Sequence, residues 1–136
     1  MLSFAPKSVT KDLLAGLPER SRKVLTDRFG LSPKGELRTL DAIGKEYGIT
    51  RERIRQIEHH SLAAVRESEA YTAHAPTWED LKRALHALGG IVAEETILAE
   101  MPKSETDRNH IIFLLTVSHH FSDRRENAHF KARWHA

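Results

Sequence analysis

The segment from Thr39 to Val65 constrains the fold more than any other part of this 136-residue chain. A helix-turn-helix needs a short helix, a sharp turn and a second helix that crosses the first one closely. Gly44 supplies the small residue that close crossing requires, and Gly48 supplies the positive φ of the turn four residues later. Thr39 and Thr50 stand where the N-caps of the two helices belong. The spacing therefore predicts a helix-turn-helix.

The side chains of the second helix divide into two faces when they are placed at about 100° per residue. Ile54, Ile57 and Val65 share one face, which we expect to pack against the first helix. The opposite face is polar and fits base readout better than a merely solvated surface would. Arg can form two hydrogen bonds with guanine, Gln two with adenine, and Glu accepts one from the cytosine amino group. This polar face consists of Arg51, Glu52, Arg55, Gln56 and His59.

Capping and turn residues predict four helices in the first half of the chain. A glycine just past a helix accepts the left-handed conformation, and a proline favours the first turn. A loop over residues 31–38 separates the second helix from the third. The expected helices are Ser8–Leu17, Pro18–Phe29 (ended by Gly30), residues 40–47 (capped by Thr39) and Arg51 to about Glu67.

The second half predicts a different arrangement. Its apolar periodicity is lost over residues 68–76, so we expect a linker there, before a helix that Thr77 opens. Apolar and polar residues alternate over residues 130–134, which is typical of a strand. Three helices followed by a β-hairpin is the order of a winged helix. The expected elements are helices Trp78–Leu88, Glu94–Met101 and residues 104–118, and strands at Ile91–Val92, near Phe121 and at Phe130–Trp134, with a turn at Asn127.

The predicted fold is therefore mainly α. It has an N-terminal four-helix helix-turn-helix domain over residues 1–67, a linker over residues 68–76, and a small C-terminal winged-helix domain over residues 77–136. Charge follows the same division, because residues 1–70 hold 13 basic and 10 acidic side chains whereas residues 71–136 hold 8 and 9. The basic character, which suits contact with nucleic acid, lies in the first half.

Composition excludes several classes of site. Without cysteine, the chain has no disulfides, Cys-based zinc or iron–sulfur sites, or thiol nucleophiles. The adjacent His59 and His60 point about 100° apart on a helix and chelate a metal poorly. We find no catalytic arrangement, so we expect neither an enzyme nor a cofactor, a metal or a small-molecule substrate. No apolar run could cross a bilayer and no secretory leader is present, so a cytoplasmic protein without a membrane partner is expected.

Two motifs in the first half resemble the fourth conserved region of primary-type (sigma-70-type) bacterial sigma factors. The first motif runs from Leu17 to Leu25 and continues over residues 28–31. The second is the run Thr39–Glu58, of which Thr50–Glu58 is close to a signature of that family. The resemblance covers roughly residues 8–67.

The resemblance implies binding to the minus-thirty-five element of duplex promoter DNA, together with RNA polymerase, in transcription initiation or its regulation. By motif position, Arg51, Glu52 and Gln56 contact bases. Thr39 and Leu40 meet phosphates through main-chain amides at a helix start. The other residues implied near phosphates are Arg20, Arg53 and Arg55.

The resemblance also implies an apolar groove for the flap-tip helix of the polymerase β subunit. The residues implied in that contact are Leu17, Val24, Leu25 and Phe29. Packing in the domain core is the alternative interpretation of these four residues, and it is the one that we favour for each of them.

Two departures from the sigma-factor pattern qualify the resemblance. Nothing here corresponds to the upstream regions that bind the polymerase clamp and melt the promoter. The chain is therefore expected to be either a fragment of a sigma factor or a separate protein with the same domain. In addition, His59 and His60 replace the small-plus-lysine pair that usually follows the signature, which weakens phosphate contact at neutral pH.

The second half resembles the winged-helix type called HARE, which is related to the N-terminal domain of the polymerase delta subunit. Its third predicted helix contains the run Ile111–Leu115 and is apolar nearly all round, so we expect it to be buried. A protein-contact or spacer role is therefore favoured over DNA binding. The resemblance is carried by Trp78, Leu81, Leu85, Leu88, Gly89, Gly90, Ile97, Ile111–Leu115, Phe121 and Phe130–Trp134.

Two other functions stay open at the level of sequence. The chain is alternatively a sigma-like adaptor or decoy that binds RNA polymerase while its DNA contacts are secondary. A third hypothesis is a DNA-binding subunit of a restriction or modification system, because HARE-type domains also occur there.

Overall fold

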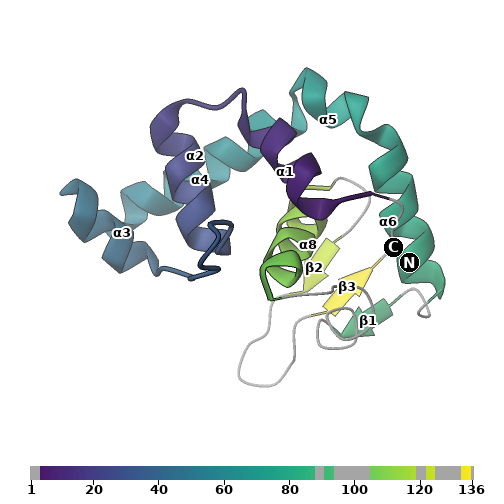
Figure 1. Ribbon diagram of the computed structural model, residues 1–136. Coiled ribbons are helices and arrows are strands. Elements are labelled where there is room, and N and C mark those ends of the chain that lie inside the picture. Colours follow the sequence, from purple (N-terminus) through teal and green to yellow (C-terminus); the bar gives the residue numbers. More distant parts are fainter. Residues whose placement is uncertain (1–3, 88–90, 94–104, 119–121, 125–132, 136) are drawn as a thin grey trace.

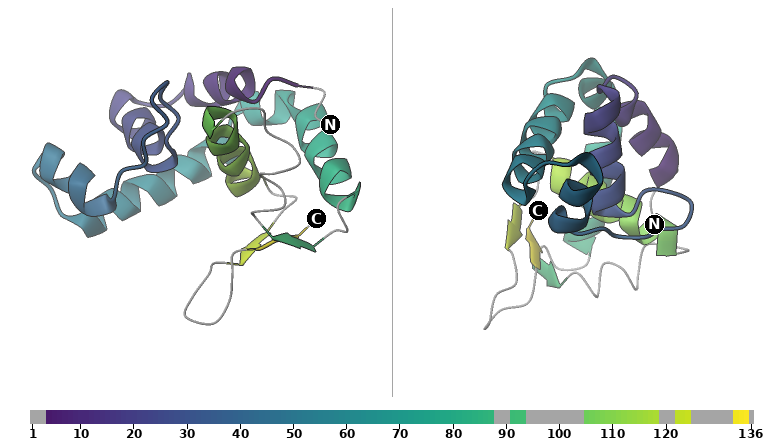
Figure 2. Two further views of the ribbon diagram at one scale, coloured as in Figure 1. Left: turned by 60° about the horizontal axis from the view of Figure 1, so that its bottom comes forward. Right: turned by 90° about the vertical axis from the view of Figure 1, so that its left-hand side faces the viewer.

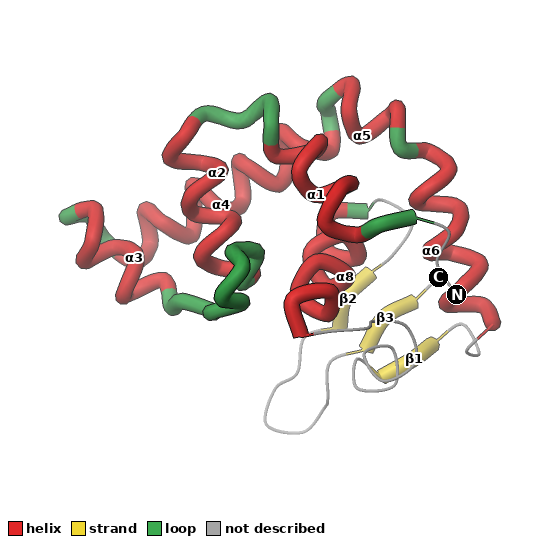
Figure 3. Tube along the Cα trace, viewed as in Figure 1, coloured by secondary structure: helices red, strands yellow, loops and turns green. Residues whose placement is uncertain are grey.

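The computed structural model describes residues 4–87, 91–93, 105–118, 122–124 and 133–135 (Figure 1). Helices dominate these ranges, and three short strands form one sheet (Figure 3). The elements are α1 (Pro6–Leu14), α2 (Glu19–Phe29), α3 (Leu40–Tyr47), α4 (Arg51–Arg66), α5 (Glu69–Ala73), α6 (Ala75–Ala87), β1 (Ile91–Ala93), α8 (Glu105–Val117), β2 (Ser122–Arg124) and β3 (Arg133–His135).

The ends of α2, α3 and α4 lie within one residue of their predicted positions because local signals set them. The hydroxyl of Thr39 accepts a hydrogen bond from the Ala42 amide at 3.0 Å, and that of Thr50 accepts one from the Arg53 amide at 3.1 Å. Gly48 ends α3 in the left-handed conformation with a φ of 69°. By contrast, α1 ends three residues before its predicted end at residue 17.

Residues 68–76, where the sequence predicts an irregular linker, are mostly helical. Ser68 caps the short helix α5, and α6 begins at Ala75 instead of opening at Thr77. The physical reason is a buried aromatic pair: the rings of Tyr71 and Trp78 stack with centroids 4.8 Å apart, and Trp78 Nε1 donates to the Tyr71 carbonyl at 2.9 Å. The division into units at 1–67 and 77–136 stays a prediction.

The larger hydrophobic core joins the two halves of the sequence. It contains buried side chains of α1, α2, α4, α5, α6 and α8, and α8 packs against α1, α2 and α4 (Figure 2). The rings of Phe29 on α2 and Phe113 on α8 meet edge-on, with centroids 5.2 Å apart. The prediction that the helix containing Ile111–Leu115 is a buried one is confirmed, because Ile111, Phe113, Leu114 and Leu115 are all 0% exposed.

The three strands pair in the order β1-β3-β2, and both pairings are antiparallel. Trp134 of β3 lies opposite Val92 on one side and opposite Asp123 on the other. The predicted helix Glu94–Met101 and the predicted turn at Asn127 lie outside the described residues. No helix in the described ranges is both long and apolar enough to span a membrane.

Candidate nucleic-acid interface

The geometry of the helix-turn-helix depends on the close approach of α3 to the start of α4. A Cβ atom placed on Gly44 would lie only 2.7 Å from the carbonyl oxygen of Ile49, so this position excludes any larger residue unless the backbone shifts. The Ile49 amide donates to the Gly44 carbonyl at 2.9 Å and closes the turn. The predicted roles of Gly44 and Gly48 are both confirmed.

A small second core fixes the orientation of α4 about its own axis. It consists of Val24, Ile43, Ile54 and Ile57, with Leu40, Tyr47 and Ile49 packed around it. Ile54 is 0% exposed and Ile57 is 8% exposed, as the sequence predicts for the face that meets the first helix. With this face buried, the opposite face of α4 must point to solvent.

The four predicted base-contacting residues lie together on that outward face. Arg51, Glu52, Arg55 and Gln56 are all exposed, and they occupy the first two turns of α4. This is the end of a recognition helix that enters a major groove in helix-turn-helix proteins. The structure therefore brings these side chains to one surface.

Two of these side chains pair with each other. Arg55 donates from Nε to Glu52 Oε2 at 2.9 Å and from Nη2 to Glu52 Oε1 at 2.6 Å. The hydrogen bonds from Arg55 hold the pKa of the Glu52 carboxyl below its ordinary value, so the carboxylate is charged at neutral pH. Because both partners are exposed, water and salt weaken the pair, and base edges can replace it at little cost.

The predicted phosphate-contacting residues come from three helices. The guanidinium of Arg20, at the start of α2, lies 5.0 Å from the ring centroid of Tyr47, the last residue of α3. Leu40 opens α3, where the first amides have no acceptor within the helix and can meet an anion. Thr39 caps that helix, and Arg53 is exposed on α4 and donates to Gln56 Oε1 at 3.4 Å.

An ion-pair network that sequence reasoning missed joins the helices behind this surface. Arg38 donates to Asp27 of α2 at 2.9 Å and also pairs with Glu46 of α3. Arg28 of α2 donates to Glu58 of α4 at 2.8 Å. These partners lie 8 to 30 residues apart in sequence. No local spacing rule finds such pairs, unlike the Lys23–Asp27 pair at i,i+4, which the sequence already permits.

The residues implied in polymerase flap contact are not all on a surface. Val24 and Leu25 are 0% exposed, so their prediction as contacts is wrong for this conformation, and the core interpretation holds for both. Leu17 and Phe29 are half-buried and pack against the larger core, where Phe29 meets Phe113. Helix α8 thus covers part of the apolar face that the resemblance assigns to a partner.

The histidines of α4 belong to no metal-binding cluster among the described residues. His59 and His60 lie further along α4, with ring centroids 5.9 Å apart. Within the described ranges, no three His, Asp or Glu side chains gather closely enough to hold a metal ion.

The segment that contains the helix-turn-helix is similar to segments of known proteins. Residues 13–67 match the family described as "Sigma-70, region 4". The chain is 50% identical over 60 residues to the "RNA polymerase sigma factor SigA" of a Bacillus species, a match that covers 44% of this chain and 16% of that protein. It is 45% identical over 56 residues to the "RNA polymerase principal sigma factor HrdD" of Streptomyces viridifaciens, covering 41% and 17%.

The matched segment thus corresponds to about a sixth of the length of these curated relatives. It begins inside α1, ends one residue after α4 and contains the whole helix-turn-helix. Residues 13–67 are therefore similar to region 4 of sigma-70 factors.

Proposed function

We propose that this chain binds duplex promoter DNA at a minus-thirty-five-like element, together with RNA polymerase, in transcription initiation or its regulation. One observation carries the proposal: the first two turns of α4 present Arg51, Glu52, Arg55 and Gln56 outward, while Ile54 and Ile57 hold the opposite face in a core. The similarity of residues 13–67 to sigma-70 region 4 supports the same function.

The proposed roles follow from the chemistry of each group. Arg51 and Arg55 can donate two hydrogen bonds to guanine, Gln56 can exchange two with adenine, and Glu52 can accept from a cytosine amino group. Gln56 gives up its bond from Arg53 to do so, which frees Arg53 for a phosphate. Phosphates are also met by Arg20, Thr39 and Leu40, and these contacts set the register of α4 on the duplex.

RNA polymerase is the proposed partner because the charge of the first half is modest. A net charge of +3 over residues 1–70 gives little non-specific attraction to DNA, so tight promoter binding needs a second contact. The β flap is the proposed site of that contact. On this chain it would use Leu17 and, once α8 moves away from it, Phe29.

We also infer that residues 77–136 form a winged helix with a protein-contact or spacer role. The order of α6, β1, α8, β2 and β3 supports this, together with the pairing of β3 between β1 and β2. Helix α8 takes the place of the usual reading helix, but its apolar side chains lie in the larger core. DNA contact by this half is therefore not proposed.

The test compares a duplex carrying a TTGACA-like hexamer with a scrambled duplex at physiological salt, with and without polymerase. We expect Arg51→Ala and Gln56→Ala each to weaken binding to the hexamer by roughly 5- to 150-fold while leaving the scrambled duplex little affected. Glu52→Ala should lower discrimination at one base pair. Arg83→Ala is the matched control, since Arg83 is also exposed but lies on α6.

Equal binding of both duplexes, together with tight capture of polymerase, would overturn the sequence-specific function. The chain would then be a polymerase adaptor or decoy whose DNA contacts are secondary.

A further inference from the structure

The net positive charge of residues 1–70 lies before the helix-turn-helix and not within it. Residues 1–30 hold 6 basic and 3 acidic side chains, whereas residues 31–70 hold 7 of each. On the helix-turn-helix itself, the ion pair of Arg55 with Glu52 balances charge further. The attraction to a polyanion that depends on net charge therefore comes from α1 and α2, which contain all six of these basic residues.

A hollow of about 520 Å³ on α2 gathers three of the six cations. Every side chain that lines this α2 hollow in the described part of the chain has a charged or hydroxyl end, whereas the walls of small-molecule pockets are mostly apolar. With three cations against one carboxylate, the hollow suits the charged surface of a macromolecule. Its described lining consists of Glu19, Arg20, Arg22, Lys23, Thr26 and Tyr47.

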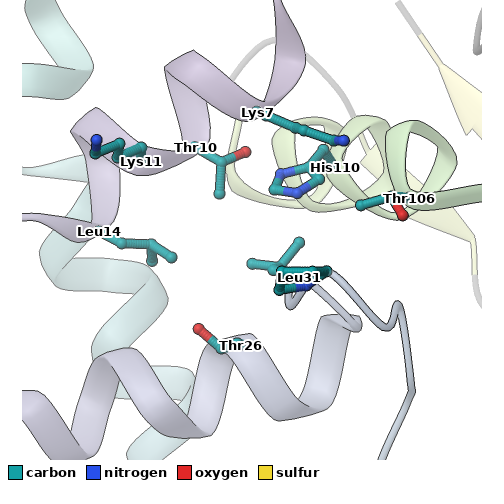
Figure 4. A pocket seen from close by; sticks show the side chains of 9 residues that line it. Lys7, Thr10, Lys11, Leu14, Thr26, Leu31, Thr106 and His110 are labelled. Carbon is teal, nitrogen blue, oxygen red and sulfur yellow. The ribbon is translucent and has the colours of Figure 1, made fainter.

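The basic surface continues from the α2 hollow onto α1. Thr26 lines both this hollow and the neighbouring pocket of Figure 4, where the exposed Lys7 and Lys11 lie across from it. Five of the six basic residues of α1 and α2 thus border two adjoining hollows. The sixth, Arg28, donates to Glu58 of α4 and belongs to the ion-pair network behind the candidate DNA-facing surface.

The two arginines of the α2 hollow are available to an anion. Neither Arg20 nor Arg22 forms an ion pair within the part of the chain that the structure describes, and Arg22 is half-buried. The guanidinium of Arg20 is placed by the ring of Tyr47, a contact that requires none of its N–H hydrogen bonds. Each guanidinium therefore keeps donors that fit a phosphate.

Lys23 has an acidic partner, but it can leave that partner at little cost. Its Nζ donates to the two carboxylate oxygens of Asp27 at 3.0 and 2.8 Å, and this hydrogen bonding raises the pKa of Lys23 above its ordinary value. Arg38 donates to the same carboxylate at 2.9 Å. Asp27 therefore keeps a partner when the Lys23 ammonium turns to another anion.

The α2 hollow lies close to the start of α4. Tyr47 lines the hollow and ends α3, and Arg51 opens α4 four residues later. Four residues span at most about 14 Å, which is the rise of about four base pairs of duplex DNA. A duplex read by the first turns of α4 would therefore have backbone phosphates within reach of the hollow. This continuity favours a nucleic-acid backbone over an acidic protein segment as the partner.

We propose that the α2 hollow binds phosphates of the duplex beside the base pairs that α4 reads, with Arg22 and Lys23 as contacts next to Arg20. Lys7 and Lys11 add to the positive potential along the same path. The inference rests on the proposed function and assigns affinity and specificity to different helices. The first two helices supply salt-dependent affinity that is the same for every sequence, whereas the outer face of α4 supplies the choice of sequence.

The test measures, by fluorescence anisotropy, binding of the full chain to a duplex with a TTGACA-like hexamer and to a scrambled duplex. The salt series starts at low concentration, where phosphate contacts are strongest. The α2 variant, Arg22→Gln combined with Lys23→Gln, should lower the slope of log affinity against log salt by about 1.8, because each lost phosphate contact removes about 0.9. Affinity for both duplexes should fall about 10-fold at low salt, with their ratio unchanged.

Two further double variants separate phosphate contact from other effects. Lys82→Gln combined with Arg83→Gln is the matched control, because it removes the same two charges from α6, where one side chain is again half-buried and the other exposed. Its slope should equal that of the parent chain. Arg22→Lys combined with Lys23→Arg keeps both charges and should keep the parent slope as well. Circular dichroism checks that each variant is folded.

The outcomes distinguish this inference from the proposed function. An unchanged slope for the α2 variant, with the specific duplex still preferred, would overturn the inference alone. A lowered slope without any preference between the duplexes would support the phosphate contacts and overturn sequence reading. No binding of either duplex at low salt would overturn both.

Two other results would also overturn the inference. A slope lowered as much by the α6 control would mean that only net charge matters. Normal DNA binding by the α2 variant together with weaker capture of polymerase would assign the hollow to an acidic protein surface.

Discussion

Helices α4 and α8 are of comparable length, but they differ in the side chains that they leave in contact with water. α4 buries Ile54 and Ile57 and leaves a polar face exposed, whereas α8 buries five of its six apolar side chains from residue 111 to 117, on several sides. An amphipathic helix can rest on its own domain and still read another molecule. A helix that is apolar nearly all round must be packed inside. The difference supports the different roles that we propose for the two halves of the chain.

The two helices also differ in what holds them in place. The start of α4 is set by local features, the Thr50 cap and the glycine turn before it. α8 is held by residues distant in sequence: Asn109 donates to the carbonyls of Gly30 and Gly35 at 2.9 and 3.1 Å, and Arg66 donates to the last carbonyls of α8. Disrupting α8 should therefore lower the stability of the whole chain. Altering the outer face of α4 should weaken DNA binding without lowering stability.

The largest effect on stability is expected at the contact between α2 and α8, which come from the two halves of the chain. Phe113→Ala removes a fully buried ring that meets Phe29, and it should lower the free energy of unfolding by about 3–5 kcal/mol. Arg51→Ala, on the outer face of α4, should change stability by less than about 0.5 kcal/mol. Urea denaturation followed by circular dichroism measures both. Similar stability losses for the two variants would remove the contrast between the helices.

The next largest effect on stability is expected at the two glycines of the helix-turn-helix. One is constrained by a close approach of the backbone and the other by its positive φ. Gly44→Ala forces a Cβ against the Ile49 carbonyl and should cost about 1–3 kcal/mol of unfolding free energy. Gly48→Ala meets open space but must keep a positive φ, which costs about 1–2 kcal/mol. Gly16→Ala is the control, because Gly16 has neither constraint. Thermal unfolding of the three variants checks this order, and an equal loss in the control would refute it.

A smaller effect is expected where Asn109 joins α8 to the loop after α2. Asn109→Ala removes two hydrogen bonds and should destabilise the fold by about 1–2 kcal/mol. Hydrogen exchange should quicken in α8 and in the loop over residues 31–38, while the amides of α3 keep their protection. Faster exchange in α3 as well would mean that the helix-turn-helix depends on α8 more than the contacts indicate.

The smallest expected effect is the contribution of His110 to the pH dependence of stability. The folded pKa of His110 lies below the value of about 6.5 that the unfolded chain has, so the unfolded state binds more protons as the solution is acidified below that value. Stability should therefore be full above the unfolded pKa and should fall as pH decreases toward the folded pKa. His110→Gln should flatten this part of the pH profile in urea titrations. An unchanged profile would show that His110 is not the responsible group.

Much of the candidate interface could be predicted from sequence because its determinants are local. Gly44, Gly48, Thr39 and Thr50 act within a few residues, and the helical period alone separates the two faces of α4. The placement of α8 could not be predicted in this way, since a run of apolar residues says that a helix is buried and not what it is buried against. The aromatic pair of Tyr71 and Trp78, which orders residues 68–76, could not be predicted either, because the sequence does not show which buried side chains contact each other.

The most direct test of the central claim measures the affinity ratio between a minus-thirty-five-like duplex and a scrambled duplex, with polymerase present, for the parent chain and Gln56→Ala. Gln56 is exposed on the polar face of α4, so its loss should leave the fold intact. We expect a ratio well above one for the parent chain, reduced by roughly 5- to 150-fold in the variant through weaker binding to the specific duplex alone. A ratio that is the same in both proteins would contradict base reading by α4.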